Sequence, residues 1–155
     1  MDADAQDVDF HALVDQAPDA MIFAGLDGII QTWNPAAERI FGHAAAAAIG
    51  QSLDIIIPES LRQAHWQGYE RALAAGDTKY RGQSLPTKSM KADGSPIYVE
   101  LSFAIVHDAD GQVIGAMAQA RDITERFERD KVTRRRIRDL EAAQEAASAA
   151  AETAS

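Results

Sequence analysis

The sequence contains no cysteine, and this absence excludes several kinds of site at once. Without a thiol the chain cannot form a disulfide, a thiolate zinc site, an iron–sulfur cluster or a cysteine nucleophile, and cysteine-based photochemistry is excluded too. The chain also lacks the positive-then-apolar start of a signal peptide, and no stretch approaches the ~20 apolar residues that a membrane span needs. We therefore expect a cytoplasmic protein without a membrane partner.

An excess of positive charge is the second feature that is missing. The 155 residues carry 15 Lys and Arg against 24 Asp and Glu, which gives a formal net charge of -9 at pH 7. Nucleic acids and anionic membranes favour basic surfaces, so we expect neither as a partner. The basic run at 134–138 lies among acidic residues, and a solvated helix face is the simpler interpretation of it.

Catalytic motifs are the third absence. The sequence has no phosphate-binding glycine loop, no recognisable set of Ser, His and Asp, and no histidine pair at metal-binding spacing. We therefore expect a protein that is not an enzyme. With 46% hydrophobic residues, the chain is long enough for one domain that buries roughly 70% of its unfolded surface.

Three Asp-Gly dipeptides divide the chain into strands. Asp-Gly suits tight primed turns with positive φ, so Asp27-Gly28, Asp93-Gly94 and Asp110-Gly111 each predict a hairpin. Apolar positions alternate with polar ones from Ile97 to Ile105, which indicates a strand with one buried face. The flanking segments predict five antiparallel strands, at 20–25, 29–33, 79–91, 97–106 and 113–124.

The segment between the second and third strands has helical signals. Asn34 is a suitable N-cap, Pro35 suits the first helical position, and Gly42 suits the end of a short helix. Short turns or helices follow, and Pro58-Glu59 opens a longer helix that carries His65. Two strands, several helices and three further strands predict an α+β domain with its helices on one face of the sheet.

The two ends of the chain differ from this central segment. We expect residues 1–18 to form an N-terminal cap with an amphipathic helix, and residues 19–122 to form the core domain. Residues 123–155 contain no glycine or proline, which predicts a linker helix. Its thin apolar stripe is compatible with a two-chain coiled coil, although the heptad pattern is irregular.

Three segments, at 20–42, 92–103 and 121–126, resemble those of PAS domains of the S-box type, and the similarity covers about residues 10–127. The resemblance implies a five-stranded antiparallel sheet in the order 2-1-5-4-3, with helices on one face and a C-terminal signalling helix. It also implies a sensory domain of a bacterial signalling protein, a homodimer, and a downstream effector domain in a longer parent protein. Signal relay would pass through Asp122, Ile123 and Thr124, which match the motif between the sheet and the signalling helix.

His65 connects this resemblance to a cofactor. It lies four residues after Leu61 and four before Tyr69, so helical spacing places an imidazole on a face expected to be buried. The segment IPESLRQAH at 57–65 is similar to the haem-binding segment of PAS oxygen sensors of the FixL and DosP kind. The resemblance implies haem b with His65 as the iron ligand, and a diatomic gas or a redox state as the signal.

The same comparison of positions gives a set of cofactor-site residues. Gln83 and Leu85 fall where those sensors have distal methionine and arginine residues, two apart on one strand face, and we expect Gln83 to be the polar distal group. Arg62 is available for a haem propionate, and Met117 suits core filling better than ligation. The full set is Ile56, Leu61, Arg62, His65, Tyr69, Gln83, Leu85, Leu101, Phe103 and Met117.

Other interpretations of His65 stay open. Flavin is not expected, because the LOV branch of the PAS family needs an adduct-forming cysteine and a glutamine at the position of Ala120. Histidine is often half-buried in small domains with its ring bonded to a backbone carbonyl. The domain would then be a cofactor-free module for dimerisation and relay, or a PAS domain for another small ligand.

Overall fold

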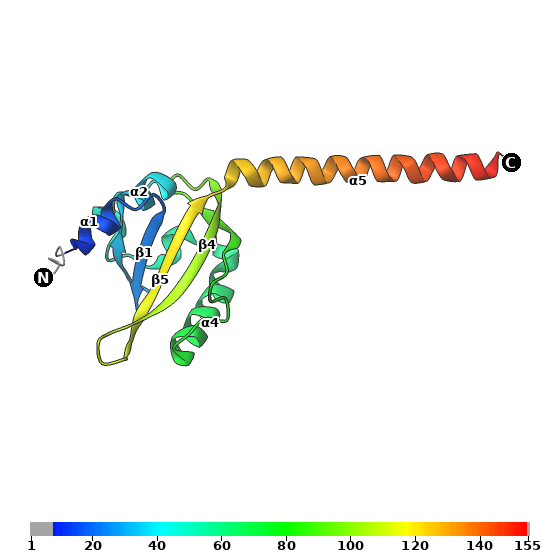
Figure 1. Ribbon diagram of the computed structural model, residues 1–155. Helices are drawn as coiled ribbons and strands as arrows, with labels where there is room; N and C mark the ends of the chain where they lie inside the picture. The colour runs from blue at the N-terminus through cyan, green and yellow to red at the C-terminus, as the bar shows by residue number, and fades with distance from the viewer. Residues whose placement is uncertain (1–7, 155) are drawn as a thin grey trace, which may run out of the picture. The chain divides into compact units, whose positions relative to one another are not determined.

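The computed structural model describes residues 8–154, which form two compact units that divide after Asp122. The first unit is built on one antiparallel sheet in the order β2-β1-β5-β4-β3 (Figure 1). The predicted α+β class and strand order are therefore confirmed. The strands are β1 (Ala20–Gly25), β2 (Ile30–Trp33), β3 (Leu85–Met90), β4 (Pro96–His107) and β5 (Val113–Asp122). The helices are α1 (Phe10–Asp15), α2 (Pro35–Phe41), α3 (Ala45–Ala48), η1 (Leu53–Ile56), α4 (Glu59–Ala75) and α5 (Thr124–Thr153).

All three Asp-Gly dipeptides form hairpin turns, but the turns are not of the predicted primed type. Gly28, Gly94 and Gly111 have φ values of 74°, 82° and 79°, and no other residue type in the described part of the chain has a positive φ. Each glycine is the fourth residue of its turn, and its N–H donates to the carbonyl three residues earlier at 2.9–3.0 Å. The connecting loops are four or five residues long, and such loops are built around ordinary type I turns.

Asn34 caps α2 as predicted and has further partners that spacing alone did not reveal. It is 1% exposed, and its Oδ1 accepts from the N–H of Ala37 at 3.0 Å and of Met21 at 2.8 Å. Its Nδ2 donates to the carbonyls of Val14 and Asp19. One buried amide thus satisfies backbone groups on three segments, as a buried polar side chain must. Gly42, with φ of 79°, ends the helix.

The third strand is shorter than predicted. It begins at Leu85, and residues 79–82 form a turn in which Gly82 has a φ of 70°. A left-handed backbone at Gly82 interrupts an extended chain, so Gln83 lies outside the strand.

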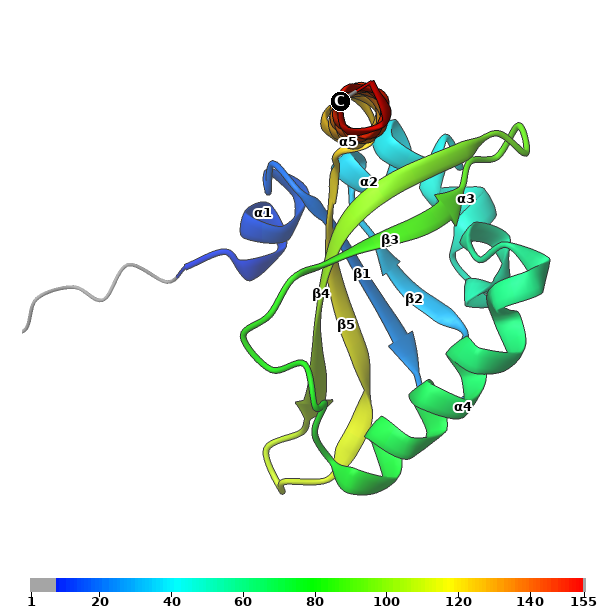
Figure 2. The same cartoon turned by 90° about the vertical axis from the view of Figure 1, so that its right-hand side faces the viewer.

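One end of the sheet carries a tightly packed core. Trp33 and Phe41 have ring centroids 5.6 Å apart, and Phe41 is 1% exposed. Figure 2 shows α3 and α4 on the same side of the sheet. We call the following buried residues the packed core: Ala20, Ile22, Ile30, Trp33, Ala37, Phe41, Ala48, Ile97, Val99 and Ala120.

The predicted N-terminal helix is present as α1. The carboxylate of Asp9 caps it by accepting from the N–H groups of His11 and Ala12. Phe10 and Leu13 are 74% and 57% exposed. The rest of this predicted segment, residues 1–7, lies outside the described residues.

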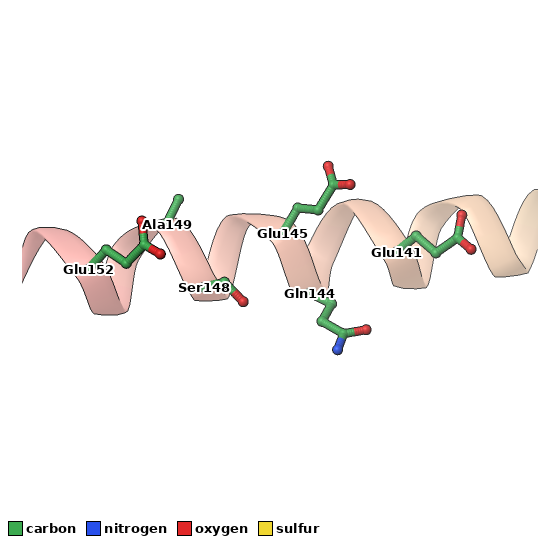
Figure 3. Close-up of a pocket in the computed structure, with 6 residues that line it drawn as sticks. All are labelled: Glu141, Gln144, Glu145, Ser148, Ala149 and Glu152. Carbon is green, nitrogen blue, oxygen red and sulfur yellow. The ribbon is translucent and has the colours of Figure 1, made fainter.

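The second unit is the predicted C-terminal helix, α5, and none of its described residues within Thr124–Thr153 is buried. Val132, Ile137 and Leu140 are 65%, 49% and 64% exposed. Figure 3 shows its region 141–152, where acidic and small side chains project from the helix. The coiled coil stays a prediction. Within residues 8–154, no helix combines the length and apolar character that crossing a membrane requires.

Candidate functional site

The helix α4 carries four of the ten predicted site residues, among them His65. Pro58 is its N-cap, and Gly76 ends it with a φ of 69°. All 17 residues of α4 are described, and none of them is buried. An ordinary amphipathic helix buries an apolar stripe, but α4 presents the half-buried rings of His65, Trp66 and Tyr69 instead.

His65 lies at the centre of these rings. Its centroid is 4.8 Å from that of Trp66 and 5.9 Å from that of Tyr69. The Nδ1 atom is buried and has no hydrogen-bond partner among the described residues. Burial lowers the pKa of His65 below its ordinary value of 6.5, although the negative charge of Asp54 opposes the shift. At neutral pH the imidazole is therefore uncharged, the form that can donate an electron pair to a metal.

Trp66 connects α4 to two other segments. Its Nε1 donates to the Asp54 carboxylate in η1 at 2.9 Å. Its ring packs against Gly28 in the β1–β2 turn, where an added Cβ would collide with the indole. Neither Trp66 nor Asp54 was predicted as a site residue. The one sequence feature that could have indicated Trp66 was its aromatic side chain directly after His65.

Tyr69 reaches the sheet itself. Its hydroxyl donates to the carbonyl of Gly25 at 2.7 Å and of Ala24 at 3.1 Å. Burial raises the pKa of Tyr69 to about 12, and the charge of Asp27 adds to the rise, whereas a hydrogen bond from the backbone of Ala116 lowers it. The phenol thus stays protonated and remains a donor at all physiological pH values.

Arg62 was predicted to be available for a haem propionate, but its guanidinium is already hydrogen-bonded within the chain. Its Nε donates to the carbonyl of Ile57 at 3.0 Å, and its guanidinium also bonds the carbonyl of Asp54 at 3.2 Å. The Asp54 carboxylate lies 3.8 Å from Nε. Arg62 therefore joins η1 to the first turns of α4, because the carbonyls of the preceding turn need a donor.

Three apolar residues of the predicted site lie close together on the sheet. Leu101 pairs with Leu85 on one side and with Ala120 on the other. Phe103 pairs with Ala118 and lies on the same face of β4 as Leu101. Leu101 and Ile56 pack against the packed core, and four predicted apolar site residues, which we call the apolar wall, are partly buried. These residues are Ile56, Leu85, Leu101 and Phe103.

Three predicted site residues lie elsewhere. Met117 pairs with Ala104, whereas Phe103 pairs with Ala118. Met117 therefore lies on the opposite face of the sheet from Phe103, and its inclusion in the cofactor site is wrong. Gln83 is exposed and precedes β3, so it does not share a strand face with Leu85. Leu61 is 40% exposed and not on a buried face, because the beginning of α4 extends past the packed core.

The predicted relay residues lie where the sheet gives way to the helix. Asp122 is the last residue of β5, Ile123 is the N-cap of α5, and Thr124 is its first residue. The strand thus ends two residues before the predicted end at Thr124, and the helix begins at Thr124.

Two other hollows do not suit a cofactor. The depression in Figure 3 is lined by residues of one helix, which cannot surround a ligand. A polar hollow of about 180 Å³ lies beside the middle of β4 and the end of β5, but its polar groups already pair with one another, as in Asp19–Arg121 at 2.9 Å and Ser84–Glu100 at 2.7 Å.

The side chains that could ligate a metal are suited to a haem rather than to a bare metal ion. Among residues 8–154, no group of three or more His, Cys, Asp or Glu side chains could hold a metal ion. A haem needs only one axial ligand from the chain, because the porphyrin supplies the in-plane ligands. The half-buried, uncharged imidazole of His65, whose buried Nδ1 has no partner within the described residues, fits such a group.

Comparison with known families and proteins identifies the fold. Residues 14–128 match the family described as PAS fold. The chain is 31% identical over 108 residues to the oxygen sensor protein DosP of Escherichia coli, covering 70% of this chain and 13% of DosP. It is 36% identical over 85 residues to the sensor protein FixL of Bradyrhizobium diazoefficiens, covering 55% of this chain and 17% of FixL.

A solved structure extends the comparison. An RNA-binding light-oxygen-voltage receptor superposes with a TM-score of 0.66 at 25% identity, covering 81% of this chain and 35% of that one. The chain spans less than a fifth of the length of the curated relatives it matches.

Proposed function

Because this chain belongs to the PAS fold family, we propose that residues 19–122 are the sensory domain of a bacterial signalling protein that binds haem b through His65. The observation that carries the proposal is the buried Nδ1 of an uncharged imidazole without a hydrogen-bond partner in the described part of the chain. A merely structural histidine normally bonds a backbone carbonyl. Similarity to two sensor proteins, DosP and FixL, supports the same function.

The chain's own residues would divide the work. His65 would bind the iron, and the ring contacts of His65 with Trp66 and Tyr69 would hold the imidazole in place. Leu101 and Phe103 would exclude water from the ligand side. The haem would supply an iron that binds a diatomic gas or changes its redox state.

The choice of gas follows from the polarity of the wall. Leu85 has no hydrogen-bond donor, and Gln83 is exposed outside the strand. Bound oxygen benefits from a donor more than carbon monoxide or nitric oxide does. We therefore propose a site that favours carbon monoxide and nitric oxide over oxygen.

Output would pass from the sheet to α5. We propose that the protein is a homodimer and that this segment has no enzymatic activity. We also propose that α5 leads to an effector domain. The exposed Val132, Ile137 and Leu140 would supply an apolar surface for the second chain.

The test is a titration of the full chain with hemin, followed by visible absorption. We expect one equivalent to bind with a Soret band, and His65→Ala to weaken binding at least 10-fold. His11→Ala and His107→Ala are matched controls at exposed histidines, and circular dichroism checks the fold. Unchanged binding in His65→Ala would contradict the assignment of the ligand.

A cofactor-free relay module, or a PAS domain for another small ligand, is the second candidate. It is favoured by the bonds of Arg62, whose guanidinium is already bonded to the carbonyls of Ile57 and Asp54 and is not free for a propionate. A complete lack of hemin uptake by the wild-type chain would leave this candidate standing.

A further inference from the structure

Tyr69 has contacts that neither haem ligation nor helix formation requires. Its ring lies beside that of His65, with centroids 5.9 Å apart and planes inclined by 32°. The two residues are one helical turn apart, so their side chains are neighbours on one face of α4. A change in the position of the imidazole therefore meets the phenol ring first.

The other end of the phenol lies at the junction of two strands. Its hydroxyl donates to the carbonyls of Ala24 and Gly25 in β1. Ala24 pairs with Ala116, and Gly25 pairs with Gly115. The hydroxyl thus bonds β1 at the level where β1 pairs with β5.

The two strands approach each other closely at this level. A Cβ at Gly115 would collide with the carbonyl oxygen of Ala24, which is one of the acceptors of Tyr69. The position of that carbonyl therefore sets how near β5 can lie to β1. A change in the hydrogen bond of Tyr69 would act on the same group.

Two other side chains of α4, those of Arg62 and Trp66, bond η1 and its end rather than the sheet. In the described part of the chain, Arg62 bonds Asp54 and Ile57, and Trp66 bonds Asp54, so both connect α4 to η1 and its end. Tyr69 connects α4 to the sheet. Because α4 buries no side chain, we expect this hydrogen bond to contribute more to the position of the helix against the sheet than it would in a packed helix.

We propose that Tyr69 is a positioning residue that couples the imidazole of His65 to the β1–β5 junction at Ala24 and Ala116. From there β5 continues to Asp122, directly before α5. The inference deepens the proposed function and rests on it for the origin of the signal, but the coupling itself is a property of the chain without ligand.

The first experiment measures that coupling in the full chain without any ligand. Amide hydrogen exchange of Gly115 and Ala116 is followed by NMR in the wild type, Tyr69→Phe, His65→Ala and the double variant. We expect Tyr69→Phe to speed exchange about 5-fold, since only the hydroxyl is lost. His65→Ala should change exchange several-fold in the wild-type background and hardly at all in the Tyr69→Phe background.

Tyr80→Phe is the matched control, because Tyr80 lies in the turn before β3, and we expect it to leave these amides unchanged. If the effects of Tyr69→Phe and His65→Ala multiply as independent changes, the coupling is overturned. This result does not depend on hemin, so failure of hemin binding and failure of the coupling are separate outcomes.

The second experiment compares the ferrous carbon monoxide complex with the free chain. We expect amide shifts along Gly115–Asp122 to be at least twofold larger in the wild type than in Tyr69→Phe, with each protein measured at saturation with hemin. Equal shifts would overturn Tyr69 as the route. If no protein takes up hemin, the proposed function fails and the exchange data decide the coupling alone.

Discussion

Ile97 and Val99 at the start of β4 are each 1% exposed, whereas Leu101 and Phe103, farther along the same face of the same strand, are only partly buried. The alternation of the sequence is equally regular over both pairs. Ile97 and Val99 pack with side chains of α2 and α3 in the packed core, whereas Leu101 lies at the margin of this core and Phe103 is not part of it.

The two regions are also held by different forces. The packed core is stabilised by burial of large apolar side chains, which resists any change in volume. By contrast, α4 is held by the hydrogen bonds of Arg62, Trp66 and Tyr69. Hydrogen bonds at partly buried positions rearrange at less cost than a close-packed core, so we expect α4 to move more readily than the packed core.

The largest expected effect tests this contrast with one type of substitution at two positions. Phe41→Ala should destabilise the domain by about 3–5 kcal/mol, because it opens a cavity in the packed core. Phe103→Ala should cost about 1–2 kcal/mol, because less surface is buried there. Urea unfolding of both variants gives the comparison. Equal losses would show that the two regions are packed alike.

A smaller effect concerns the contact between Trp66 and the β1–β2 turn. Gly28→Ala should cost about 2 kcal/mol, since alanine is strained at a positive φ and its Cβ collides with the indole. The control is Gly94→Ala, where φ is 82° but the surrounding space is open, and it should cost about 1 kcal/mol. In a Trp66→Leu background the two substitutions should converge. A persistent difference would place the cost outside this contact.

The smallest effect is the pH dependence of stability that His65 contributes. The pKa of His65 is lower in the folded chain than in the unfolded chain, so the unfolded state binds more protons as the pH falls below about 6.5. The stabilising contribution is therefore complete above this pH and is lost as the pH falls through the folded pKa. Urea midpoints from pH 7.5 to 5 should decline more steeply for the wild type than for His65→Phe. Parallel declines would mean that the imidazole is accessible to water.

Local sequence signals predicted the regular parts of the fold. Asn34, Pro35 and Gly42 bound α2 as expected, and the Asp-Gly dipeptides marked the hairpins, because caps and turns depend on residues that are neighbours in the chain. The face of β4 followed from its alternation. The left-handed Gly82 was the local signal missed when Gln83 was assigned to a strand.

The sequence by itself determined the sheet, its helices and the helical position of one histidine, since these follow from periodicity, caps and turns over a few residues. Only the tertiary structure decided that Nδ1 of His65 has no partner within the described residues, that Arg62 turns back to η1, that Met117 faces away, and that Tyr69 bonds Ala24 and Gly25. The physical reason is distance along the chain: Tyr69 and Ala24 are 45 residues apart, and no local preference encodes which carbonyl a side chain reaches after folding.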